Sequence, residues 1–333
     1  MSGERKLFEI RRYFNFETDD LMLIFGRYFS HMAKKIVAFG EIVWDILPNG
    51  KVLGGTPSNL VFRCNSFGEE GHLLSRVGDD DLGNEALKRL KELKISDRNV
   101  QIDFEFPTGE VQVSFDKKGE SIYKVKEDVA FDHIEFSPEA LKLVRQADCL
   151  FFGLLPQRYG LSKNTIRELI NESPDSLHFF DLKLFEHFFD VKVVEQLLKI
   201  ANVVRIKEKE IGFLAGELGI EFANLDDFLE KIAAQYKIDL VIVTLGEKGI
   251  AALHKDEGRF TDPGYIIEME DNIGSGMAFS AGFLHYYLNG KSLMDSIKFG
   301  NAAGALNTTK MGATAFFNKK DVLQFMKKTS QYK

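Results

Sequence analysis

The hydrophobic residues of this chain fall into short continuous runs that alternate, over much of its length, with segments of helical period. The clearest runs of strand length lie at residues 36–39, 149–152, 178–181, 201–206 and 240–244. Such runs are typical of strands buried on both faces, and their alternation with helices indicates βαβ units. The pattern therefore predicts an α/β fold with a parallel sheet covered by helices on both faces.

The first apolar run continues past Gly40 and Glu41 through residues 42–44 to Asp45. This pattern predicts one long, buried first strand with Asp45 near its carboxyl end. Ligand sites of parallel sheets lie at the carboxyl ends of the strands. Asp45 is therefore predicted to face a polar ligand.

Residues 101–130 change to a period of two, which is typical of strands with one solvent-facing side. Residues 110–115 and 121–125 alternate between apolar and polar positions, with a polar turn between them, and this predicts a β-hairpin. The acidic run at residues 79–81 precedes an amphipathic segment over 84–94. We assign that run to a helix cap and not to a metal site.

A glycine-containing turn over residues 270–279 leads into an apolar helical run over 281–288, which Gly290 is expected to end as a left-handed C-cap. Gly274 and Gly276 leave backbone N–H groups open at the positive end of that helix. An anion such as a phosphate is favoured there. A tight turn into a core helix is the alternative explanation of the same pattern.

Composition and charge exclude several classes of protein. The chain has 333 residues, 44% hydrophobic and 28% charged, and its formal net charge of −7 gives no basis for binding nucleic acid or an anionic membrane. Its two cysteines, Cys64 and Cys149, provide neither a metal cluster nor a disulfide framework. We therefore expect a cytoplasmic protein with reduced cysteines.

Residues 1–33 differ from the rest of the chain, being basic and aromatic at first and then acidic. Their longest apolar run, 21–25, is too short to span a membrane. We predict that residues 1–33 form an extension outside the fold, with the natural start at Met22 or Met32. A docking helix is the alternative role for this extension.

The predicted anion-binding turn resembles the signature of ribokinase-type (PfkB) carbohydrate kinases, which is usually written DTxGAGD and is followed by a small residue and Phe. Here it reads DNIGSGMAF over residues 271–279. In that family the two glycine amides stabilise charge on the transferred phosphate, and the last Asp takes the proton from the sugar hydroxyl. The resemblance therefore places Gly274, Ser275 and Gly276 at the catalytic site, with Met277 in place of the Asp base.

Two further motifs resemble the sugar site of this family, namely the strand leading to Asp45 and the GGxPxN turn over residues 54–59. By resemblance, Asp45 and Asn59 bind sugar hydroxyls, and the backbone of Gly54 and Gly55 packs against the sugar ring. Taken alone, each motif is better explained as a turn or a helix cap. Their occurrence together and in this order favours the sugar site.

Motifs on the nucleotide side are also present. Thr244, Gly246 and Gly249 match the family's TLGxxG turn, and Asn301 lies in the segment that matches the helix beside the adenine pocket. Glycine turns of this kind are common in α/β proteins, so each alone is equally a structural turn. Their order along the chain implies a nucleotide site, with ATP and magnesium as cofactors.

Several polar positions depart from the family pattern. The NxxE motif, which helps to place magnesium-bound phosphate, keeps Glu210 but has Lys207 in place of asparagine, so Glu210 is expected to act on the metal only through the phosphate. Lys183 and Phe185 stand where fructokinase relatives have asparagine and arginine, and Asn272 replaces threonine. A positioned general base contributes roughly 10²–10⁴-fold. Losing it together with these groups predicts weak or absent activity.

The resemblance spans about residues 34–328 and is strongest to the bacterial fructokinase branch. It implies a ribokinase-like fold with a small β lid from about 46–54 and 101–130, which often forms a contact between two subunits. The expected function is ATP-dependent phosphorylation of a sugar hydroxyl. The alternatives are a non-catalytic regulatory protein that binds sugar or nucleotide, and a kinase that uses Asp271 or Glu210 as its base.

Overall fold

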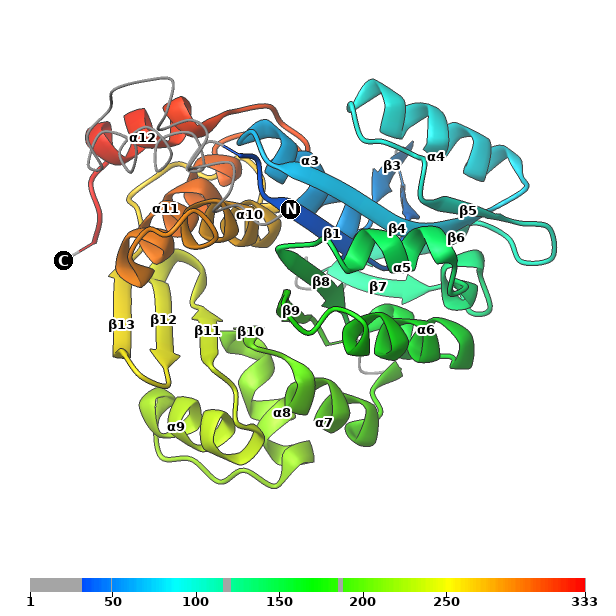
Figure 1. Cartoon of the computed structure of the whole chain (residues 1–333). Coiled ribbons are helices and arrows are strands. Elements are labelled where there is room, and N and C mark those ends of the chain that lie inside the picture. Colours follow the sequence, from blue (N-terminus) through cyan, green and yellow to red (C-terminus); the bar gives the residue numbers. More distant parts are fainter. Residues whose placement is uncertain (1–31, 49, 116–120, 185–187, 333) are drawn as a thin grey trace, which may run out of the picture. The chain divides into compact units, whose positions relative to one another are not determined.

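A computed structural model describes residues 32–48, 50–115, 121–184 and 188–332, and the unit considered below begins at Lys34 (Figure 1). Within these residues, nine strands form one sheet in the order β13-β12-β11-β10-β9-β8-β1-β4-β5. Their bounds are β1 Lys35–Phe39, β4 Glu70–Gly78, β5 Val100–Asp103, β8 Cys149–Gly153, β9 Leu177–Leu182, β10 Val203–Lys207, β11 Leu240–Thr244, β12 Gly249–His254 and β13 Gly258–Pro263. Every pairing from β5 to β11 is parallel, which confirms the predicted parallel sheet. β12 and β13 add an antiparallel edge that the apolar runs did not predict.

Helices cover both faces of this sheet. Their bounds are α3 Thr56–Ser66, α4 Asp81–Glu92, α5 Pro138–Val144, α6 Gly160–Asn171, α7 Val191–Ile200, α8 Ile211–Leu218, α9 Leu225–Tyr236, α10 Ser275–Tyr287, α11 Leu293–Thr308 and α12 Lys319–Lys328. Because successive side chains of a strand point to opposite faces, β1 buries Ile36 and Ala38 against the core that contains α3, α10 and α11. Val37 and Phe39 join the core that contains α5 to α9.

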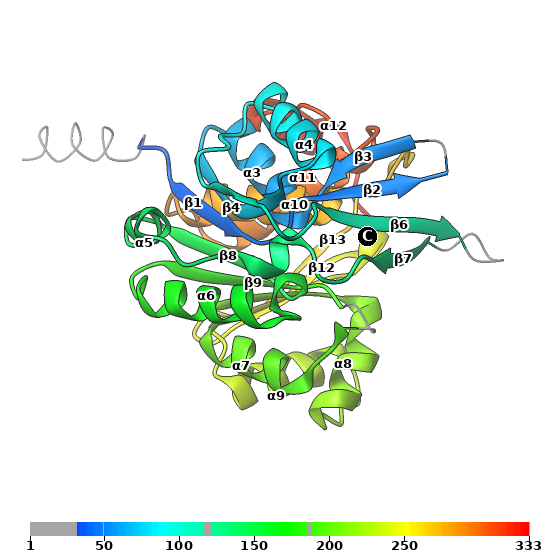
Figure 2. The same cartoon turned by 90° about the vertical axis from the view of Figure 1, so that its right-hand side faces the viewer.

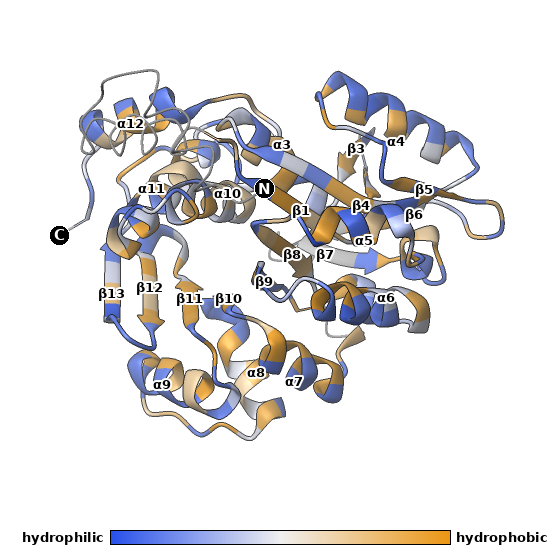
Figure 3. Cartoon of the chain, in the orientation of Figure 1, coloured by the Kyte–Doolittle hydropathy of each residue, from blue (hydrophilic) through white to orange (hydrophobic). Residues whose placement is uncertain are grey.

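The hydropathy of the elements agrees with this layering. In Figure 3 the strands β8 and β12 are mainly hydrophobic, whereas α6, α7 and α9 carry both hydrophobic and hydrophilic residues. Strands buried on both faces need apolar side chains on both, while a covering helix needs them only on its inner face. None of the helices in the described ranges is long and apolar enough to cross a membrane.

A second, four-stranded sheet has the order β3-β2-β6-β7 (Figure 2). Its strands are β2 Val43–Leu47, β3 Gly50–Gly54, β6 Gly109–Phe115 and β7 Ser121–Val125. β6 and β7 pair antiparallel, which confirms the predicted hairpin. The range 101–130 also contains β5, which pairs with β4 in the large sheet and is not part of the small one.

The prediction of one long first strand is wrong. β1 ends at Phe39, and the chain leaves the large sheet at Gly40, whose φ is 147°. A Cβ at Gly40 would lie 2.9 Å from Pro57 and 3.0 Å from Pro156, so glycine permits both this φ and the close packing. Asp45 therefore lies in β2 of the small sheet, and not at the carboxyl end of a strand in the large sheet.

The helix signals in the sequence are found in the structure. Asp80 is the N-cap of α4, where its carboxylate accepts a hydrogen bond of 2.7 Å from the Gly83 N–H, as expected for the acidic run. Gly274 is the N-cap of α10 with a φ of 81°. Gly290 is left-handed, with a φ of 71°, but α10 already ends at Tyr287.

Candidate active site

The glycine turn before α10 presents free backbone donors. The Ala278 N–H bonds to the Gly274 carbonyl at 2.9 Å, and the Ser275 N–H lies 3.4 Å from the Asn272 carbonyl. Among the described residues, the N–H groups of Gly276 and Met277 have no acceptor. Unpaired amides at a helix N-terminus favour an anion. Residues 274–276 are half-buried, whereas Met277 is buried, so the turn itself is partly open to solvent.

Both glycines of the turn are required by close packing. A Cβ at Gly274 would lie 2.5 Å from the Cα of Ala313, and its positive φ also favours glycine. A Cβ at Gly276 would lie 2.9 Å from both terminal nitrogens of Arg205. The turn therefore rests on the segment at Ala313 on one side and on the Arg205 guanidinium on the other.

Arg205 is a site residue that the sequence did not reveal. It lies in β10 opposite Asp181 of β9, and both side chains are buried. The Arg205 Nε lies 2.7 Å from Asp181 Oδ1, and Nη1 donates to the Thr244 hydroxyl at 3.5 Å. The only signal in the sequence was a lone cation inside the apolar run 201–206, since a charge in a buried strand needs a partner.

Further cations lie beside this pair. The pKa of Lys207 is lowered to about 8, mainly by burial and also by the nearby Arg205 guanidinium and Lys183, while Glu210 and Asp181 act in the opposite direction. Burial also raises the pKa of Glu210. Glu210 accepts hydrogen bonds from the N–H groups of Leu184, at 3.2 Å, and of Lys207, at 3.1 Å. Three cations and two carboxylates thus surround the ends of β9 and β10.

The predicted sugar-side residues also lie close together. A Cβ at Gly54 would clash with the Asp45 carboxylate, and one at Gly55 would clash with the Glu41 carbonyl oxygen. The buried Glu41 carboxylate accepts from the Thr56 N–H at 2.9 Å, which anchors the first turn of α3. The glycines are therefore packed against the strand that carries Asp45, as close backbone approach requires.

Asp45 is connected electrostatically to the phosphate side. Burial raises the pKa of its carboxyl to about 6, Lys183 lowers it and Glu41 raises it. Lys183 lies near enough to both Asp45 and Lys207 to affect the pKa of each. Within the described residues, the side chains of Asp45 and Asn59 have no hydrogen-bond partner, and both are half-buried. They are free to bind hydroxyl groups.

The predicted nucleotide-side residues differ in their surroundings. Thr244 ends β11 beside Arg205, and Gly246 is exposed with a φ of 64°. A Cβ at Gly249 would clash with the Asp262 carbonyl oxygen. The buried Asn301 donates to Asp262 Oδ2 at 2.6 Å and to the Pro263 carbonyl at 2.9 Å, so its amide N–H groups anchor the end of β13.

The remaining residues of the signature have defined partners. Met277 is 6% exposed in the first turn of α10. The Ser275 hydroxyl donates to the Asn272 carbonyl at 2.9 Å. Asp271 accepts from the N–H groups of Ile273 and Gly312, each at 2.9 Å, so both of its oxygens organise the loop. Phe185, another departure from the family pattern, lies outside the described residues.

The described residues contain no cluster of three or more His, Cys, Asp or Glu side chains that could hold a metal ion by itself. Magnesium is usually bound by one or two carboxylates together with substrate phosphates and water. Glu210 is the carboxylate available at this position, but backbone amides occupy its oxygens. The residues therefore fit a metal that is carried by phosphate and contacts Glu210 through water.

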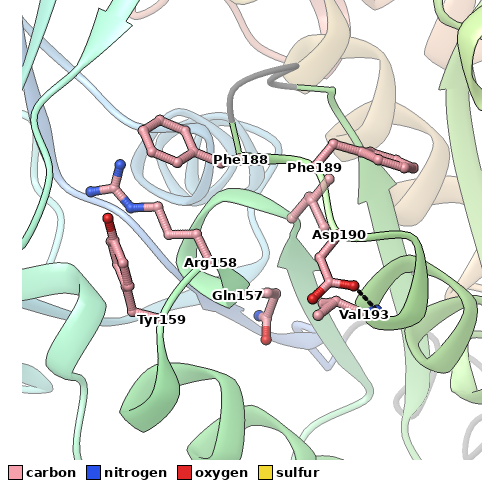
Figure 4. Close-up of a pocket in the computed structure, with 8 residues that line it drawn as sticks. Gln157, Arg158, Tyr159, Phe188, Phe189, Asp190 and Val193 are labelled. Atoms are coloured by element: carbon pink, nitrogen blue, oxygen red, sulfur yellow. Dashed lines mark hydrogen bonds between the residues drawn. The ribbon is translucent and has the colours of Figure 1, made fainter.

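A separate cavity of about 210 Å³ lies beyond the ends of β8 and β9 (Figure 4). It is lined by Leu154, Gln157, Arg158, Tyr159, Phe188, Phe189, Asp190 and Val193. Asp190 caps α7 by accepting from the Val193 N–H, and Arg158 is paired at 2.7 Å with the buried Asp132. None of the predicted site residues lines this cavity.

The mostly parallel sheet with its small second sheet defines a ribokinase-like α/β fold. The family model for pfkB family carbohydrate kinases matches residues 23–320, and the chain belongs to that family.

Individual relatives agree with this assignment. Fructokinase-1 of Zea mays is 26% identical over 322 residues, which cover 88% of this chain and 98% of that protein. The crystal structure of an uncharacterized sugar kinase from Pyrococcus horikoshii has a TM-score of 0.75 at 26% identity and covers 87% of this chain and 97% of its own. The ATP-bound fructokinase of Xylella fastidiosa has a TM-score of 0.77 at 18% identity, covering 89% and 99%, which shows the fold alone.

Proposed function

We propose that this protein binds ATP–magnesium and a sugar of the hexose class, and transfers the terminal phosphate to a sugar hydroxyl at a low rate. The observation that carries the proposal is the α10 N-terminus, where the N–H groups of Gly276 and Met277 have no acceptor among the described residues and Gly276 packs closely on the buried Arg205 guanidinium. Phosphoryl transfer depends mainly on positioning and on stabilisation of charge. This arrangement supplies such stabilisation without the missing carboxylate.

Each group has a role in the proposed reaction. Asp45 and Asn59 hold sugar hydroxyls, while Lys207 and the α10 amides hold the terminal phosphate. The hydroxyl oxygen forms a bond to phosphorus, and the bond from phosphorus to the ADP oxygen breaks. Magnesium, when bound, neutralises phosphate charge, and Glu210 would contact it through water.

The low rate follows from the fate of the hydroxyl proton. A thioether cannot accept a proton at neutral pH, so Met277 cannot act as the base. Asp271 and Glu210 each accept two backbone hydrogen bonds, which fix their carboxylates in structural roles, and we assign the base to neither. The proton therefore leaves to water or to a phosphate oxygen, without the roughly 10²–10⁴-fold contribution of a positioned base.

A second candidate function is that of a sensor that binds sugar and nucleotide but does not turn them over. Met277 favours it, because the binding groups are present while the proton acceptor is missing. The expected pairing of two copies through the small sheet is compatible with either function and stays a prediction.

Calorimetric titration with ATP–magnesium and with fructose, run beside a coupled assay of ADP release, tests the proposal. Fructose is the first probe because relatives at about a quarter identity are fructokinases. We expect saturable binding of both ligands and slow, sugar-dependent ADP release. Binding of both ligands without release would favour the sensor. Binding of neither would refute both functions.

A further inference from the structure

Arg63 in α3 is a buried cation that has no acidic partner among the described residues. Its side chain is only 1% exposed, and the guanidinium carbon lies 3.5 Å from the centre of the Phe317 ring. No ion pair joins it to a carboxylate in the described residues. Burial lowers its pKa to about 9. A buried charge held only by neutral groups is costly, so its presence calls for an explanation other than stability.

The Arg63 guanidinium donates hydrogen bonds to neutral oxygens in α11 and in the segment that follows α11. Nη1 donates to the Phe317 carbonyl at 3.2 Å, and Nη2 donates to the Ala315 carbonyl at 2.7 Å and to Asn307 Oδ1 at 3.1 Å. These acceptors lie in the last part of α11 and in the segment that follows it. Arg63 therefore fixes the position of that segment relative to α3.

The same segment supports the phosphate-binding turn. Asn307 donates through Nδ2 to the Ile273 carbonyl at 2.8 Å, and this carbonyl directly precedes Gly274. Because Arg63 occupies the Asn307 Oδ1, the amide nitrogen of Asn307 is turned toward Ile273. Gly274 also packs closely on Ala313, which precedes the carbonyls held by Arg63.

The other end of α3 carries the sugar side. Asn59 precedes Arg63 by four residues in the same helix, so the two side chains project from the same helix face. α3 packs directly on α10. Contacts therefore run from the sugar-binding end of α3, through Arg63 and Asn307, to the turn at Gly274.

We propose that Arg63 is a positioning residue that holds the turn at Gly274–Gly276 in its anion-binding conformation and links that turn to the sugar-binding end of α3. The claim that the turn binds phosphate rests on the proposed function, but the positioning role does not. A purely stabilising role makes a different prediction, because loss of the guanidinium would leave three oxygen acceptors unpaired and lower the stability of the whole fold without a selective effect on the turn.

The test compares Arg63→Met and Arg63→Lys with Arg158→Met, a matched control that removes another buried arginine, one paired with Asp132. Hydrogen–deuterium exchange is followed in peptides covering residues 271–280 and 312–318, and ATP–magnesium affinity is measured by calorimetry. We expect Arg63→Met to raise exchange in these peptides about tenfold and to weaken ATP–magnesium binding by about tenfold. Arg63→Lys should retain part of both, whereas Arg158→Met, which leaves the buried Asp132 unpaired, should raise exchange evenly over the chain and not selectively in these peptides.

The outcomes test the positioning role of Arg63 separately from the proposed function. Unchanged exchange in a folded Arg63→Met protein, or a rise spread evenly over the whole chain, would overturn the positioning role. If the unmodified protein does not bind ATP–magnesium, the proposed function fails, while the exchange result still decides the role of Arg63. If Arg63→Met does not fold, the exchange of Arg63→Lys relative to Arg158→Met decides it.

Discussion

Replacing Gly276 by alanine tests the contact between the proposed phosphate-binding turn and Arg205. The new Cβ would lie 2.9 Å from both terminal nitrogens of Arg205 and 3.1 Å from its Cζ, which is closer than carbon side chains normally approach. The guanidinium has little freedom to move, because it is buried and lies 2.6 Å from Asp181 Oδ1. Either the ion pair or the start of α10 must shift.

The expected cost follows from this geometry. Overpacking of a buried site typically costs about 1–3 kcal/mol, which corresponds to a fall in Tm of roughly 2–6 °C for a chain of this size. Displacing the turn or the guanidinium should also weaken ATP–magnesium binding by about tenfold, which corresponds to about 1.4 kcal/mol. Sugar binding should change little, since the sugar-side groups are not touched.

Gly216→Ala in α8 is the matched control. Gly216 is exposed, and nothing in the described residues lies within 4 Å of a Cβ at this position. Alanine there should be neutral or stabilising by up to about 1 kcal/mol, because glycine is unfavourable in a helix. Thermal denaturation and calorimetry of both variants provide the measurement. A Gly276→Ala protein with unchanged Tm and unchanged ATP–magnesium affinity would refute the contact described here.

Three further predictions concern charge and the amino-terminal segment. The pKa of Asp45 in the folded protein is about 6, against an ordinary value of 3.8, so its contribution to stability relative to Asp45→Asn should be present below pH 4 and be lost as the pH rises through 6. The fructose-induced rise in Tm should instead grow over that range, and flat pH profiles would contradict both expectations. Since the pKa of Lys207 is about 8, ATP–magnesium affinity should fall above pH 8, and Lys207→Met should remove this dependence; an identical profile in the variant would exclude Lys207 as its source. A chain beginning at Met32 should keep the Tm and oligomeric state of the full chain, and a large loss of stability would show that residues 1–31 pack on the main domain.

Much of the fold could be predicted from the pattern of apolar residues. The runs at β8 to β11 are continuous because these strands are buried on both faces, and the hairpin of β6 and β7 alternates because one face of the small sheet is exposed. The division between β1 and β2 could not be predicted. The runs 36–39 and 42–44, on either side of Gly40 and Glu41, are both apolar, and hydrophobicity alone does not show that the chain passes from one sheet to another.

The candidate site, too, could be predicted only in part from the sequence. The glycine turn was recognisable because local sequence specifies a turn and its helix, whereas Asp45 was singled out by resemblance to a family motif and its strand was predicted wrongly. Arg205 and Arg63 were not recognised, because their function depends on partners distant in the chain. Asp181 precedes Arg205 by 24 residues, and Asn307 follows Arg63 by 244. A single sequence gives no sign of such pairs beyond an unexplained charge among apolar neighbours.

The central claim is that this site retains groups that can bind sugar and ATP–magnesium, and that the absence of a proton acceptor at residue 277 is the main limit on its rate. Met277→Asp tests it most directly, with Met277→Asn as a control of the same size and polarity that cannot act as a base. The measurement is the rate of sugar-dependent ADP release at saturating ATP–magnesium. The account predicts that the Asp variant exceeds the unmodified protein and the Asn variant by about tenfold or more, within the range of a general base. Equal rates for the Asp and Asn variants, both folded and both binding ATP–magnesium, would contradict it.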